Sequence, residues 1–193
     1  MLFPFRHGAD PYMLVVSMTG VKMGDRLLQI GCAHGGRLAA VASKVGLSGH
    51  AVAVVPDEPS AARARKGSTQ AGVLVDIEIA PMTRLRSGDS AFDLAVIDNA
   101  DGFIGTMRTA DGVATMREAL RVLRPGGRVV VVGALPRGGL AALLTRAPSA
   151  AGFDATAALR AQGFKSVRVL AEREGLQFVE GIKPRGSDVT ART

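Results

Sequence analysis

The chain has 193 residues, of which 47% are hydrophobic and 21% are charged, and it carries a net charge of +7. This composition is globular and excludes a disordered chain, and the length fits one domain, residues 1–193, better than two. Aromatic residues make up 4% and tryptophan is absent, so the basic surface lacks the stacking side chains used to bind single-stranded nucleic acid. We therefore expect no nucleic-acid partner.

Targeting and metal signals are missing from the sequence pattern. No apolar run reaches the roughly 18 residues of a membrane helix, and the start, "MLFPFRHGADP", lacks the long apolar centre of a signal peptide. The single cysteine, Cys32, has no internal disulfide partner, and no Cys/His cluster has zinc spacing. A cytoplasmic protein without a membrane span or a metal site is expected.

The first expected helix lies between Asp10 and Gly20. Asp10 is a good N-cap, Pro11 suits the first helical position, and Gly20 is a stop signal. We expect residues 1–24 to form this short helix and a small lid segment.

Strands and helices alternate through the next part of the chain. Apolar runs predict strands over 25–30, 50–55 and 72–79. Between them, an apolar-faced helix is expected over 35–46, and Asp57 is expected to cap a second helix.

The second half continues the alternation. "FDLAVID" (92–98) predicts a strand, and 111–123 predicts a helix with Val113, Met116, Leu120 and Leu123 on one side. "RPGG" is expected to break this helix before a strand over 128–134. Four consecutive valines in that strand indicate burial on both faces, as in the middle of a parallel sheet.

The chain is expected to finish with a helix over 154–162 and a hairpin formed by 165–172 and 176–183. Residues 184–193 are expected to be a disordered tail. The order of elements predicts an α/β fold with a doubly wound sheet, right-handed crossovers and an antiparallel ending.

Three stretches together resemble the class I S-adenosylmethionine-dependent methyltransferases: "LLQIGCAHGG", "FDLAVID" and "REALRVLRPGGRVVVVG". The resemblance runs from about residue 21 to residue 183. It implies a Rossmann-like, mostly parallel sheet of seven strands with an antiparallel last strand, and S-adenosylmethionine as cofactor. That ending, and the lack of a clean GxGxxG, disfavour a dinucleotide dehydrogenase.

The resemblance also implies where the cofactor is held, namely just beyond the carboxyl ends of the first four strands. The residues that it assigns to cofactor binding are Gln29, Gly31, Cys32, Ala33, His34, Gly35, Val55, Pro56, Asp57, Pro81, Met82, Thr83, Asp98 and Asn99.

This chain departs from the family pattern at four of those positions. Gln29 replaces an acid, Ala33 replaces the middle glycine of the loop, Val55 replaces the acid that accepts the ribose hydroxyls, and Pro81 replaces the acid near adenine. Because a hydrogen bond to a charged group is worth about 1.5–3 kcal/mol, cofactor binding is expected to be weak or absent. Restoring the acid with Val55→Asp is expected to tighten binding about tenfold.

No catalytic residue is assigned by the pattern, but three side chains are candidates. Asp98 and Asp101 follow the fourth strand at the expected pocket mouth, and His34 lies in the cofactor loop. Each has a structural alternative as an ordinary loop or cap residue. Cys32 is interpreted as a buried, inert thiol.

Two functions from different classes follow. The first is methyl transfer from S-adenosylmethionine to a small-molecule acceptor. The second is a non-catalytic member of the same fold that acts as a binding subunit, with another protein or a second copy of the chain as its partner; the missing acids favour this alternative.

Overall fold

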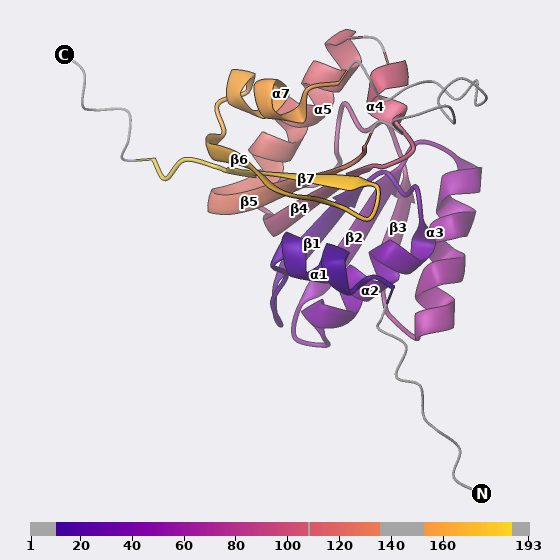
Figure 1. Cartoon of the computed structure of the whole chain (residues 1–193). Coiled ribbons are helices and arrows are strands. Elements are labelled where there is room, and N and C mark those ends of the chain that lie inside the picture. The colour runs from indigo at the N-terminus through magenta and orange to yellow at the C-terminus, as the bar shows by residue number, and fades with distance from the viewer. Residues whose placement is uncertain (1–10, 108, 136–152, 187–193) are drawn as a thin grey trace, which may run out of the picture.

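The computed structural model describes residues 11–107, 109–135 and 153–186 (Figure 1). The expected cap Asp10, the rest of the segment 1–10 and residues 187–193 of the expected tail lie outside the described residues. The helices are α1 (Met13–Thr19), α2 (Gly35–Val45), α3 (Glu58–Ala71), α4 (Phe103–Thr106), α5 (Thr109–Val122) and α7 (Ala155–Ala161). The strands are β1 (Arg26–Ile30), β2 (His50–Val55), β3 (Asp76–Ile79), β4 (Phe92–Asn99), β5 (Leu123–Ala134), β6 (Lys165–Arg173) and β7 (Leu176–Ile182).

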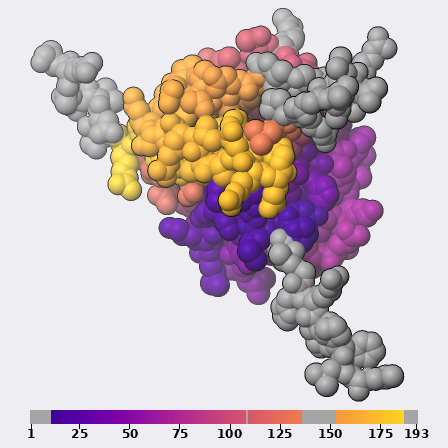
Figure 2. All heavy atoms as spheres, viewed as in Figure 1, coloured from indigo at the N-terminus to yellow at the C-terminus, as the bar shows by residue number. Residues whose placement is uncertain are grey.

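The strands form one seven-stranded sheet in the order β3-β2-β1-β4-β5-β7-β6. Neighbouring strands from β3 to β5 are parallel, whereas β7 is antiparallel to both β5 and β6. The predicted doubly wound sheet with an antiparallel ending is confirmed. In the space-filling view the yellow hairpin β6–β7 lies beside the indigo N-terminal part of the chain (Figure 2).

The helices cover both faces of the sheet (Figure 1). Side chains of α4, α5 and α7 pack into one apolar cluster, and those of α1, α2 and α3 pack into the clusters of the opposite face. The valines of β5 alternate between the two faces: Val129 and Val131 join the first cluster, and Val130 and Val132 join the cluster under α1 and α2. The predicted burial of this run on both faces is confirmed, since all four are at most 1% exposed.

The starts of two elements differ from the sequence prediction. The strand expected over 72–79 begins only at Asp76, because Gly72 adopts a left-handed conformation (φ 65°) that ends α3. Val73 N–H then donates back to the Ser68 carbonyl, so this segment completes the helix instead of the sheet. The first helix begins at Met13 after Tyr12, with Pro11 in a turn before it, although Gly20 ends it as expected.

The buried face of α5 also differs from the prediction. Val113 is 38% exposed, and Leu123 belongs to β5 rather than to the helix. Instead, Met116 and Ala119 lie on the buried face of α5. The "RPGG" turn lies inside β5 as a bulge, because β4–β5 pairing jumps from Leu123 to Arg128.

One aspartate, Asp93, links the amino end of β4 to its two neighbouring strands, β1 and β5. Asp93 accepts hydrogen bonds from the backbone and side chain of Arg26, at 2.8 Å and 3.1 Å, and forms a second ion pair with Arg124. The hydrogen bond from Arg26 is the main reason that the pKa of Asp93 lies below its ordinary value, and Arg124 contributes as well. Partial burial acts in the opposite direction. The pairs therefore stabilise the fold above the ordinary aspartate pKa of about 3.9, and this stabilisation is lost as the pH falls below that value.

We expect Asp93→Asn to lower the free energy of unfolding by about 1–3 kcal/mol at neutral pH, because two charge-assisted pairs are lost. The difference from the wild type should shrink on acidification, because near pH 3 the carboxylate is largely protonated in the unfolded chain while its arginine partners keep it ionised in the folded protein. Urea unfolding at pH 7 and pH 3 measures both values. An equal difference at the two pH values would contradict the ion-pair explanation.

Candidate functional site

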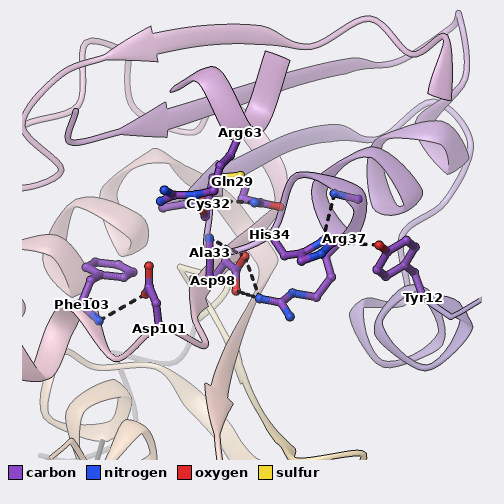
Figure 3. Close-up of polar contacts among 12 residues, drawn as sticks. Tyr12, Gln29, Cys32, Ala33, His34, Arg37, Arg63, Asp98, Asp101 and Phe103 are labelled. Atoms are coloured by element: carbon purple, nitrogen blue, oxygen red, sulfur yellow. Dashed lines mark hydrogen bonds and ion pairs between the residues drawn. The ribbon is translucent and has the colours of Figure 1, made fainter. Parts of the chain in front are cut away.

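The candidate residues lie along one edge of the sheet. Strands β3, β2, β1 and β4 are adjacent and parallel, so the segments that follow them emerge at the same edge. Open sheets of this kind bind ligands beyond the carboxyl ends of their strands. Direct contacts join the loop after β1 to the end of β4: Asp98 contacts Ala33 and Arg37 there (Figure 3).

The loop after β1 turns at a glycine. Gly31 has a φ of 78°, and a Cβ there would lie 2.8 Å from the Phe103 ring and 3.1 Å from the Asp98 carbonyl oxygen. Glycine alone relieves both the left-handed backbone and the crowding. The buried amide of Gln29 donates to the Gly31 carbonyl at 3.1 Å, so this side chain supports the loop from within.

Asp98 is the next-to-last residue of β4, and it is buried, with only 2% of the residue exposed. Its Oδ2 accepts the Ala33 N–H at 3.0 Å, and its Oδ1 accepts from Arg37 Nη2 at 3.1 Å (Figure 3). Burial raises the pKa of Asp98, with Arg37 and the backbone donors of Ala33 and Ala100 acting in the opposite direction. Both oxygens are therefore engaged inside the protein.

His34 caps the helix that follows the loop. Its Nδ1 accepts the Gly36 N–H at 3.2 Å, and the Tyr12 hydroxyl lies 3.4 Å from the same nitrogen. Tyr12, which directly precedes α1, points toward the exposed imidazole, with the ring centroids 5.5 Å apart (Figure 3). With Nδ1 accepting from the helix, the remaining ring nitrogen, Nε2, carries the proton of a neutral imidazole.

The end of β2 presents no free carboxylate. Val55 is 0% exposed and packs with Cys32, Leu38 and other residues under α2 and α3. Pro56 and Asp57 follow at the surface, but Asp57 Oδ1 accepts the Ser60 N–H at 2.8 Å. The predicted cap of α3 is thereby confirmed, and this hydrogen bonding holds the pKa of Asp57 below its ordinary value.

The segment after β3 is also without acids. Pro81 is exposed, Thr83 is half-buried, and Met82 packs into the core beneath the sheet edge. Its connection to β2 is a backbone bond from Ala80 N–H to the Val55 carbonyl at 3.1 Å. These residues provide apolar walls and backbone groups, not charge.

The two polar residues after Asp98 accept hydrogen bonds from the first turn of the short helix α4, whose N-cap residue is Gly102. Asn99 is buried and its Oδ1 accepts the Ile104 N–H at 2.8 Å. Asp101 is exposed, and one of its oxygens accepts the Phe103 N–H at 3.3 Å. Of the two catalytic candidates with a carboxylate, Asp98 and Asp101, Asp101 is the one exposed to solvent.

Cys32 is a buried residue of the loop 31–35, and desolvation raises the pKa of its thiol to about 11. A thiol with that pKa is protonated at neutral pH and is a poor nucleophile, in line with the interpretation as an inert residue. Among the residues described, no group of three or more His, Cys, Asp or Glu side chains could hold a metal ion. The described helices also include none that is long and apolar enough to cross a membrane.

The candidate list from sequence missed three side chains that shape this edge. Arg37 pairs with Asp98, Arg63 Nε donates to the Cys32 carbonyl at 3.0 Å, and Phe103 covers Gly31. A signal for Arg37 was present in the sequence. It lies in the first turn of a predicted helix, where the helix dipole disfavours a cation, so a nearby acid was to be expected.

Comparison with known proteins gives a consistent result. A family model described as "Methyltransferase domain" matches residues 27–127. The chain is 31% identical over 108 residues to an uncharacterised 37.1 kDa protein in transposon TN4556 of Streptomyces fradiae, covering 56% of this chain and 30% of that protein. It is 28% identical over 162 residues to the methyltransferase GfsG of Streptomyces halstedii, covering 83% of this chain and 55% of GfsG. The chain therefore spans about half, or less, of the length of these relatives.

Among solved structures, a SAM-dependent methyltransferase from Aquifex aeolicus superimposes with a TM-score of 0.69 at 16% identity, covering 88% of each chain. At that identity the likeness concerns the fold. Together with the family match, it supports S-adenosylmethionine as the cofactor of this fold.

Proposed function

This chain belongs to the methyltransferase domain family, and from that premise we propose that it transfers a methyl group from S-adenosylmethionine to a small-molecule acceptor. The observation that carries the proposal is the glycine turn at Gly31, held at the sheet edge where this fold places its ligand.

The residues present fit the cofactor in one half of the proposed site. The loop 31–35 leads into the amino end of α2, a position that suits an anionic group of a ligand, and its glycines Gly31 and Gly35 let the loop pack closely on Phe103 and on the Arg63 backbone. The half beyond β2 and β3 offers apolar contact but no carboxylate for the ribose, because Val55 is buried and Asp57 is engaged as a cap. We therefore expect binding that is weaker than a complete set of acids would give.

When bound, S-adenosylmethionine supplies an electrophilic methyl group, so the protein's task is alignment and, for some acceptors, removal of a proton. Asp98 is a poor general base here because its carboxylate is paired with Arg37 and an amide. Asp101 is the better candidate base, since it is exposed. His34 is proposed to donate a hydrogen bond from its Nε2–H to the carboxylate of the bound cofactor.

A second candidate function is that of a non-catalytic binding subunit, with a protein or a second copy of this chain as partner. The burial of Val55 favours it, because the position at which the family usually presents an acid has become part of the core. Under this alternative, the fold remains stable without any cofactor.

Isothermal titration calorimetry with S-adenosylmethionine and S-adenosylhomocysteine distinguishes the two. We expect a dissociation constant of about 10 μM, equivalent to a binding free energy of about −7 kcal/mol, for a site that has the loop 31–35 but lacks the ribose-binding acid. Gly31→Ala is the control, because its Cβ would meet Phe103 and should abolish the heat. The absence of heat at hundreds of micromolar ligand would favour the partner function instead.

A further inference from the structure

The loop 31–35 is held by hydrogen bonds from several elements of the protein. Gly31 N–H donates to the Val54 carbonyl of β2 at 2.9 Å, and Arg63 of α3 donates to the Cys32 carbonyl. From β4, Asp98 accepts the Ala33 N–H. The loop conformation is therefore set by neighbouring strands and helices, including a side chain 65 residues farther along the chain.

Asp98 differs from the other residues that hold the loop because it binds two groups at once, one in the loop and one in α2. One oxygen holds the Ala33 amide, and the other holds the guanidinium of Arg37 in the first turn of α2. The Arg37 side chain is 17% exposed, so the pair is largely sheltered from water. A buried carboxylate that is fully engaged in this way is suited to fixing geometry and poorly suited to accepting a substrate proton.

The charge balance supports the same conclusion. A cation near a helix N-terminus is unfavourable, and Arg37 lies at the amino end of α2. Asp98 neutralises it, and without the carboxylate the guanidinium would be released at the very point where the loop becomes the helix. Ala33 lies in the middle of this loop, and its backbone N–H is the group through which Asp98 holds the loop.

We propose that Asp98 is a positioning residue: it fixes the loop 31–35 through Ala33 and Arg37, and thereby sets the affinity of the site for its cofactor without touching the reacting atoms. The affinity part of this inference rests on the proposed function. The part that concerns the loop holds for the protein without ligand.

The chain offers a matched control on the same strand. Asp93 is also paired with arginines, Arg26 and Arg124, but lies at the amino end of β4, away from the loop. Asp98→Asn and Asp93→Asn each remove one negative charge from β4. A general loss of stability would affect the two variants alike, whereas a positioning role predicts effects on the loop from Asp98 only.

The first measurement is amide hydrogen exchange, followed by mass spectrometry, on the ligand-free protein. We expect Asp98→Ala to speed exchange in residues 31–37 about tenfold, and Asp93→Asn to leave that segment unchanged. Asp98→Asn should speed it less, because an asparagine oxygen still accepts the Ala33 N–H. Unchanged exchange in both Asp98 variants would overturn the proposal; if Asp98→Ala does not fold, Asp98→Asn decides it.

The second measurement is calorimetric titration of the same variants with S-adenosylmethionine. Asp98→Ala should weaken binding about tenfold, Asp98→Asn should recover part of the loss, and Asp93→Asn should bind as the wild type does. Wild-type affinity in Asp98→Ala would overturn the link to affinity. A wild type that does not bind would refute the proposed function, and the exchange measurement would still decide whether Asp98 positions the loop.

Discussion

Gly67→Ala is expected to destabilise the protein by about 3 kcal/mol or more, although alanine is normally the better helix former by about 1 kcal/mol. The reason is the crossing of α3 and α2. A Cβ at Gly67 would lie 2.7 Å from Gly35 Cα and closer still to the Gly35 carbonyl group. Backbone cannot move aside as a flexible side chain can, so the two helices would have to separate.

Gly105→Ala in α4 is the matched control, because no atom lies within 4 Å of the added methyl group. It should be neutral or slightly stabilising. Urea denaturation of both variants gives the comparison. Since α2 starts at the end of the loop 31–35, Gly67→Ala should also weaken cofactor binding in the fraction that folds. A Gly67→Ala protein as stable as the wild type would mean that the helices do not cross this closely.

Val55→Asp is expected to cost about 3–5 kcal/mol of stability, the second large effect. The sequence alone predicts tighter cofactor binding, because an acid would return to the position that meets the ribose. In the structure that side chain is 0% exposed and lies among apolar residues under α2 and α3. A carboxylate there must either be buried without a partner or push the end of β2 outward.

Val55→Thr separates size from charge, since threonine has nearly the shape of valine but carries a hydroxyl. Its cost should be about 1–2 kcal/mol. Thermal unfolding and calorimetric titration of both variants give stability and affinity together. A stable Val55→Asp protein that binds S-adenosylmethionine tenfold more tightly would show that the carboxylate reaches the ligand, against the burial seen here.

The strands and helices that the sequence predicted well are those whose burial is visible in a short window. For the valine run of β5 and the two strands of the hairpin, the local sequence pattern is enough to indicate a strand. The predictions were wrong where contacts with other parts of the chain determine the local structure or the buried face. Gly72 completes α3 by back-bonding, and Val113 faces outward because α5 turns Met116 toward the sheet.

The site was predictable at the level of segments and not at the level of contacts. The sequence placed the loop 31–35 and the "DNAD" stretch at the same sheet edge, and β1 and β4 are indeed adjacent. It did not reveal that Asp98 turns toward Ala33 and Arg37, because that choice depends on side-chain geometry across more than 60 residues of chain. Nor did the family pattern indicate that Val55 had joined the core.

The antiparallel ending of the sheet has a consequence for biosynthesis. β5 has buried valines on both faces, yet one of its edges is covered only by β7, which pairs with it from Arg128↔Ile182 to Ala134↔Leu176. While the ribosome is still translating the residues between these strands, β5 can associate with β4 alone. The nascent chain then displays an apolar strand with an open edge, the kind of surface that chaperones bind and that drives aggregation. Protection of this strand begins only when the hairpin has emerged and folded back.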